Sequence, residues 1–165
     1  MTAAKRLNPW VQLAALCLVP FTSVLGNAMF MPVLPDLKRE LGVPDTVVGL
    51  TVTGFSLAAG FGIPLAGFLA DRYGRKVVVL PALLVYAVGA VVAGLGGLWL
   101  GAGALPVLLI GRVVQGFGAA GMSYMAMAFV GDLFRGEQRV TALGVLEATG
   151  GLGKVLSPIV GASVG

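Results

Sequence analysis

The chain has 165 residues, of which 58% are hydrophobic and only 11% are charged, and its mean hydropathy is +0.97. A typical soluble domain has about 25% charged residues, so this composition excludes an ordinary soluble globule, a coiled coil and a solvated disordered chain. The single cysteine, Cys17, excludes a disulfide framework and a cysteine-based metal cluster, and the chain has no histidine. The composition therefore predicts an all-α integral membrane protein without a metal site.

Long segments without charge indicate how often the chain crosses the membrane. Four such segments occur, at residues 7–35, 46–70, 77–111 and 113–131. One crossing needs about 20 apolar residues, and a helix over 77–111 would be roughly 52 Å long, too long for a ~30 Å hydrocarbon core. Its glycines after position 93, with Pro106, predict a turn there. We therefore expect about five transmembrane helices, at residues 9–31, 46–70, 77–97, 104–130 and 140–165.

The basic residues between these segments predict the orientation. If the helices alternate in direction, seven basic residues share one side: Lys5, Arg6, Arg72, Arg75, Lys76, Arg135 and Arg139. The other side has only Lys38 and Arg39, beside three acidic residues. Cytoplasmic loops are enriched in Lys and Arg, so residues 1–8 are expected in the cytoplasm. The other connections are then two cytoplasmic loops at 71–76 and 131–139, and two external ones at 32–45 and 98–103.

Two glycine-rich segments resemble nucleotide-binding motifs in sequence, but neither is expected to bind a nucleotide. Residues 116–121 match G-x-G-x-x-G, but they lie inside an apolar helical segment and not at a strand-to-helix turn, so they predict close helix packing. Residues 150–154 are similar to part of a phosphate-binding loop, which also requires Gly at position 148 and Ser or Thr at position 155, where this chain has Ala148 and Val155. No basic patch with interleaved aromatic residues indicates nucleic acid, and no nucleophile–base pair indicates an enzyme.

The polar residues inside the predicted helices are the candidate functional residues. An ionisable group is costly in a membrane helix, so it faces the bundle interior or a cavity. Arg112 and Gln115 share one helix face, and so do Glu147 and Lys154, seven residues apart. Two interpretations stay open: a buried network that only fixes helix packing, or a polar pathway in which Glu147 could carry a proton.

The last predicted helix also has small residues at every fourth position: Thr149, Gly153, Ser157, Gly161 and Gly165. Such a stripe lets another helix approach closely, and Pro158 favours a bend beside it. The stripe is either a tight packing surface or a flexible, sealing surface between two halves of a larger protein.

Four segments together resemble the signatures of the major facilitator superfamily. The family's loop signature between helices two and three resembles residues 67–80, GFLADRYGRKVVVL, and its helix-four motif resembles residues 111–120, GRVVQGFGAA. The helix-one motif of the drug:proton antiporters is similar to residues 25–35, LGNAMFMPVLP, which include Gly26, Asn27, Pro32 and Pro35. Their helix-five motif is similar to residues 153–162, GKVLSPIVGA, where Ser157 and Ala162 replace two glycines.

The resemblance implies a fold of two six-helix halves, of which this chain supplies helices one to five. It implies a secondary active transporter in the plasma membrane, of the bacterial cytoplasmic type, that exports small drug-like molecules by alternating access. No cofactor is implied; the proton gradient would be the energy source, and the partners would be lipid, substrate, protons and the second half. A truncated, non-transporting membrane module is the alternative, as is a uniporter or symporter for another small solute.

The resemblance also implies roles for individual residues. The loop signature would close the cytoplasmic side through Gly67, Asp71, Arg72, Gly74, Arg75, Lys76 and Asp132. Asp71 would meet the amino end of a helix in the other half, and Arg75 would pair with Asp132. Arg112, with Gln115 beside it, would take part in proton coupling. The alternative is that the basic residues of the loop only determine the topology.

Overall fold

The structure is a computed structural model that describes residues 8–28, 35, 38–39, 42, 44–98 and 104–164. These residues form long helices: α1 (Pro9–Ala28), α3 (Asp45–Tyr73), α4 (Arg75–Leu98), α5 (Ala104–Leu133) and α6 (Glu137–Val164). No strand occurs among the described residues. The predicted all-α fold of about five long helices is confirmed for this part of the chain.

The helices extend past the uncharged segments from which they were predicted. The turn between α3 and α4 is the single residue Gly74, so most of the expected loop at 71–76 is helical. Likewise, only residues 134–136 separate α5 from α6, where a loop over 131–139 was expected. The reason is that charged residues interrupt the apolar segment in the sequence, but their backbone groups can still form the hydrogen bonds of the helix. An acidic residue such as Glu137 even favours the first turn of a helix.

Both turns depend on a glycine in the left-handed region. Gly74 has φ +91° and its N–H donates to the carbonyl of Ala70 at 2.9 Å, which closes the end of α3. Gly136 has φ +57° before the first residue of α6. Glycine adopts these angles without the strain that a Cβ atom would cause. The two turns therefore reverse the chain over one and three residues.

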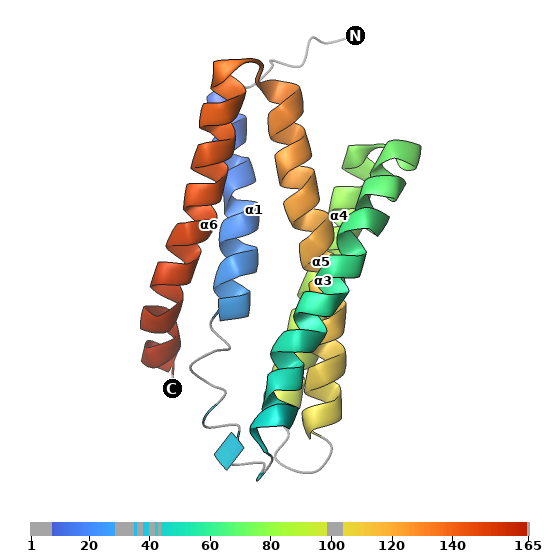
Figure 1. The fold of residues 1–165 in the computed structure, drawn as a ribbon, viewed down its shortest axis with the longest axis vertical. Helices are drawn as coiled ribbons and strands as arrows, with labels where there is room; N and C mark the ends of the chain where they lie inside the picture. Colours follow the sequence, from blue (N-terminus) through green and yellow to red (C-terminus); the bar gives the residue numbers. More distant parts are fainter. Residues whose placement is uncertain are drawn as a thin grey trace.

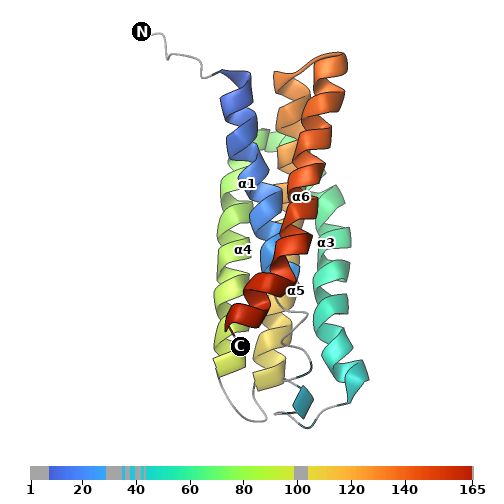
Figure 2. The same ribbon diagram turned by 90° about the vertical axis from the view of Figure 1, so that its left-hand side faces the viewer.

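The helices form an elongated bundle in which consecutive helices run in opposite directions (Figure 1). The start of α1 and the two short turns lie at one end of the bundle, and the described start of α3 and end of α6 lie at the other. Figure 2 shows α5 between α4 and α3, with α1 and α6 in front of it. Helix α5 contacts all four other helices, while α1 packs mainly against α6.

Glycines let α4 and α5 pack backbone to backbone. A Cβ atom added to Gly118 would lie 2.3 Å from the backbone nitrogen of Tyr86, and one on Gly111 would lie 2.3 Å from that of Ala93. From the other helix, a Cβ on Gly89 would lie 2.3 Å from the nitrogen of Gln115. No side chain fits at such distances, so small residues allow this packing. The glycine-rich residues 116–121 therefore serve the packing that the sequence predicts.

Four of the helices described are long and apolar enough to cross a membrane: α1, α3, α4 and α5. Helix α6 is 28 residues long, but it does not meet the same criterion for composition. Glu147 and Lys154 in its middle, together with several glycines, reduce its hydropathy. Whether α6 crosses the membrane, and which end of the bundle faces the cytoplasm, therefore stay predictions from the sequence.

Candidate functional site

Arg112 lies inside the bundle, where α5 meets α1 and α3. Its side chain is 1% exposed. The guanidinium donates one hydrogen bond to Gln115 Oε1 at 2.9 Å and another to Asn27 Oδ1 of α1 at 2.5 Å. Its Cζ lies 4.8 Å from the centre of the Phe55 ring of α3. A buried arginine is thus held by two amide oxygens and an aromatic face, which stabilise its charge without an acid among these three partners.

The surroundings of this cluster explain why the helices meet there. The Tyr86 hydroxyl of α4 donates to the backbone carbonyl of Ser23 at 3.3 Å, which ties α4 to α1. A Cβ atom on Gly26 would lie 2.5 Å from that hydroxyl oxygen, so a glycine is needed at this crossing. Because a buried tyrosine hydroxyl requires a partner, this contact fixes the position of the end of α1. Asn27 is the next residue and is thereby held against Arg112.

A pocket of about 410 Å³ lies beside the Arg112 cluster, between α1, α3, α5 and α6. Its polar lining residues are Ser23, Asn27, Ser123 and Lys154. Its remaining lining residues are apolar: Val24, Ala28, Phe55, Ala59, Ile63, Ala119 and Ala120. Asn27 and Phe55 contact Arg112 and also line this pocket. These two side chains therefore connect the Arg112 cluster to the pocket.

A second, smaller pocket of about 200 Å³ adjoins it between α1, α5 and α6. Glu147 and Lys154 both line this pocket, as their shared helix face predicts, and both are exposed in the chain. They form no ion pair with each other or with any other described residue. Lys154 is therefore common to both pockets, whereas Glu147 belongs to the smaller one alone.

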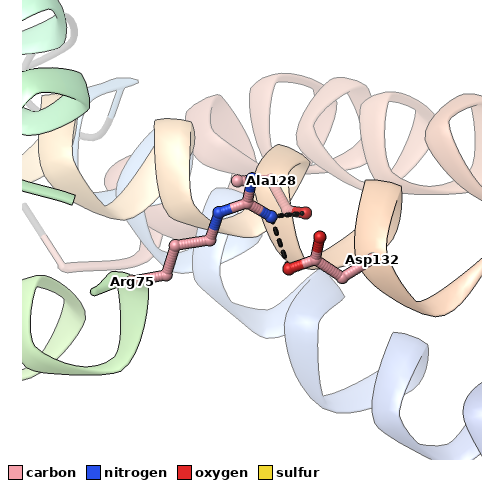
Figure 3. Close-up of polar contacts among 3 residues, drawn as sticks. All are labelled: Arg75, Ala128 and Asp132. Atoms are coloured by element: carbon pink, nitrogen blue, oxygen red, sulfur yellow. Dashed lines mark hydrogen bonds and ion pairs between the residues drawn. The ribbon is translucent and has the colours of Figure 1, made fainter. Parts of the chain in front are cut away.

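A second arginine lies at the end of the bundle that carries the short turns. Arg75, the first residue of α4, forms an ion pair with Asp132 near the end of α5 (Figure 3). The same Nη1 atom donates to the backbone carbonyl of Ala128 at 2.8 Å. The side chains of Arg75 and Asp132 are 38% and 57% exposed, so water screens their attraction. The pair links the two helices at the surface.

Comparisons with known proteins agree with the four sequence signatures. The family model described as Major Facilitator Superfamily matches residues 16–165, nearly the whole chain. The chain belongs to the Major Facilitator Superfamily. The fold class, the non-enzymatic character and the multi-pass membrane location that the sequence predicts follow from this membership.

Three relatives illustrate the similarity. The Bacillibactin exporter of Bacillus subtilis is 44% identical over 90% of this chain and 37% of its own length. The Multidrug transporter protein MdtP of Bacillus subtilis is 32% identical over 90% of this chain and 26% of its own. The Tetracycline resistance protein, class C, of Escherichia coli is 33% identical over 86% of this chain and 35% of its own. The chain thus spans about a third of the length of these relatives.

The other residues of the superfamily's loop signature lie near the Arg75 pair. Asp71 and Lys76 are exposed, and Asp71 makes no hydrogen bond or ion pair within the described part of the chain. The Arg72 guanidinium lies 5.7 Å from the centre of the Tyr73 ring. A Cβ atom on Gly67 would touch the Tyr124 ring at 3.4 Å, so α3 approaches α5 closely there. The role of this signature as a gate stays a prediction.

The motif of the fifth helix lies against the first helix of the same chain. A Cβ atom on Gly153 would lie 3.2 Å from the carbonyl oxygen of Phe21 in α1, and Ser157 is fully buried. This part of the small-residue stripe therefore packs within the chain. Helix α6 continues through Pro158 and Gly161. Gly165 and Pro32 lie outside the described residues, as do Lys5 and Arg6, while Pro35 is exposed.

Four contacts were not foreseen from the sequence: Asn27 Oδ1 on Arg112, the Phe55 ring over Arg112, the Tyr86 hydroxyl on α1, and the Ala128 carbonyl on Arg75. Tyr86 could have been singled out because it is a polar side chain inside an apolar segment. Asn27 is part of the helix-one motif, but the motif does not predict its contact with Arg112. Phe55 and Ala128 carry no such signal, since an apolar side chain and a backbone carbonyl occur throughout these helices.

Proposed function

We propose that this chain forms the first five helices of a proton-coupled exporter of small molecules in the bacterial cytoplasmic membrane. The observation that carries the proposal is the buried Arg112, held by Asn27 and Gln115 directly behind a mostly apolar pocket. Burying a charge in a membrane helix is expensive, so such a residue indicates a substrate or ion pathway. The names of three relatives, a Bacillibactin exporter, a Multidrug transporter protein and a Tetracycline resistance protein, support export as the direction of transport.

Arg112 would act on proton movement through its charge. A guanidinium is effectively always protonated, so the proton must bind to another group. Glu147 is the carboxyl that lies away from the helix ends in the described residues, and it faces the pocket that Lys154 shares with the Arg112 side. In this proposal, the proton binds the Glu147 carboxylate and the substrate binds in the adjoining pocket, and Lys154, which lines both pockets, links the two movements.

The Arg75–Asp132 pair would form part of the cytoplasmic gate. It fixes the start of α4 to the end of α5, next to the exposed Asp71 at the end of α3. Asp71 would then contact the second half of the transporter when the cytoplasmic side closes. Because this contact would form and break in each cycle, an exposed, weakly stabilising position suits it.

The proposal is tested with the complete transporter in inverted membrane vesicles, to which a proton gradient is applied. Tetracycline, ethidium and iron-free bacillibactin are supplied as probes. We expect at least one of them to accumulate inside the vesicles, and a protonophore to abolish that accumulation. Vesicles that contain the correctly inserted protein but accumulate none of the probes would contradict drug or siderophore export. Accumulation that a protonophore leaves unchanged would contradict proton coupling.

A further inference from the structure

The larger pocket has positive charge on two of its sides. Lys154 lines it from α6. Arg112 lies behind two other lining residues, with Asn27 Oδ1 2.5 Å from its Nη2 and the centre of the Phe55 ring 4.8 Å from its Cζ. No aspartate or glutamate is among the described residues that line this pocket. A ligand in this pocket would therefore meet two cations and no anion from these helices.

The rest of the pocket suits an apolar or aromatic body. Small-molecule sites are mostly apolar, with a few polar groups that fix orientation, and they enclose about 300–1,000 Å³. The pocket volume of about 410 Å³ lies in this range. Apart from Lys154, its polar side chains are two serines and one asparagine, which are uncharged. Charge discrimination on the α6 side thus depends on Lys154.

Glu147 does not cancel this charge in the structure. Seven residues along a helix separate it from Lys154 by ~10 Å of rise, and the two side chains form no ion pair. Glu147 lines only the smaller pocket, whereas Lys154 lines both. The ammonium group can therefore reach a ligand in the larger pocket while the carboxylate stays outside it.

We propose that Lys154 determines substrate specificity by binding the acidic group of an anionic, amphipathic substrate. The ammonium group would donate hydrogen bonds to a carboxylate, sulfonate or phenolate, while the ring of Phe55 and the aliphatic walls contact the apolar body. Arg112 adds attraction from behind Asn27 without direct contact. This inference deepens the proposed export function and rests on it. Opposite charges across a binding site favour the matching ligand and suppress the wrong one.

The test compares two dyes that share a ring system but differ in charge, the anion fluorescein and the cation rhodamine 123. Their binding to the purified complete transporter in detergent is measured by fluorescence anisotropy. We expect the unsubstituted protein to bind fluorescein more tightly. Lys154→Gln should weaken fluorescein binding by about 10-fold or more, because a charge-assisted hydrogen bond is lost, and should leave rhodamine 123 binding unchanged or stronger. Lys154→Arg should retain the preference for fluorescein.

Three results would overturn the proposal: no fluorescein binding by the unsubstituted protein, equal affinity for the two dyes, or an equal loss of both on Lys154→Gln. Lys38→Gln is the matched control, because it removes the same charge from an exposed lysine that lines neither pocket, and it should leave fluorescein binding unchanged. Since binding in detergent needs no gradient, this test is independent of the vesicle assay. If the protein bound fluorescein more tightly than rhodamine 123 but transported no probe in the vesicle assay, the export function would be contradicted and the role of Lys154 would stand.

Discussion

Two arginines, Arg112 and Arg75, show how differently one side chain acts when it is buried between helices and when it lies at the exposed end of a bundle. Arg112 is 1% exposed and is held by amide oxygens of Asn27 and Gln115, while Arg75 is 38% exposed and pairs with a carboxylate. The buried charge must be stabilised by fixed groups because the protein shields it from bulk solvent. The exposed pair is screened and contributes little to stability. Disrupting the first should therefore impair folding and coupling, and disrupting the second should impair only the gate.

The largest difference in stability is expected between two glycine variants, one beside the Arg112 cluster and one near Arg75. Gly118→Ala places a Cβ atom 2.3 Å from a backbone nitrogen of α4, so the helices must separate beside the Arg112 cluster. Gly131→Ala, near the Arg75 end, meets only the terminal atoms of the Arg139 side chain at 3.3 Å, and these can move. We expect Gly118→Ala to destabilise by about 1–3 kcal/mol or more and Gly131→Ala by less than about 0.5 kcal/mol. Unfolding of the purified transporter in detergent measures both, and equal losses would contradict the close packing of α4 on α5.

The next largest loss of stability is expected when a hydrogen-bond acceptor of Arg112 is removed. Asn27→Leu removes the acceptor of its Nη2 group, so we expect a loss of about 1.5–3 kcal/mol in the free energy of unfolding. Asn27→Asp keeps an acceptor oxygen at the same place and should retain most of that stability. A Leu variant as stable as the original protein would show that the Asn27 contact is unimportant for the fold.

At the end of the bundle, the expected effect is on transport. Asp71→Asn removes a charge that no described residue pairs with, so membrane insertion should be unchanged while efflux falls several-fold. Substrate accumulation in inverted vesicles, normalised to the amount of inserted protein, gives the comparison. Equal accumulation by the variant and the original protein would remove Asp71 from the gate.

The smallest effect on stability is expected for the exposed ion pair. Asp132→Asn leaves the hydrogen bond from Arg75 to the Ala128 carbonyl intact, so the free energy of unfolding should fall by no more than about 1 kcal/mol. Transport should fall further than this stability change explains. A loss of several kcal/mol would show that the pair is a structural contact, and the contrast with Arg112 would fail.

The sequence predicted the helices well because each apolar segment must form a helix in a membrane. The ends of the helices were less predictable, since residues 71–76 are charged but almost entirely helical. The shared face of Arg112 and Gln115 followed from their spacing alone. The contact of Arg112 with Asn27 did not, because the two residues are 85 positions apart and meet only through the packing of α1 on α5. Nothing in the sequence predicts that the ring of Phe55 lies over the Arg112 guanidinium.

The most direct test of the account measures protons moved per substrate transported by the complete protein in vesicles with a pH-sensitive dye. Arg112→Ala should abolish substrate-induced proton movement, because the buried charge that acts on proton movement is lost. Arg75→Gln should slow substrate and proton movement together and leave their ratio unchanged. An unchanged proton flux in the Arg112→Ala protein would contradict the role of the buried arginine in coupling.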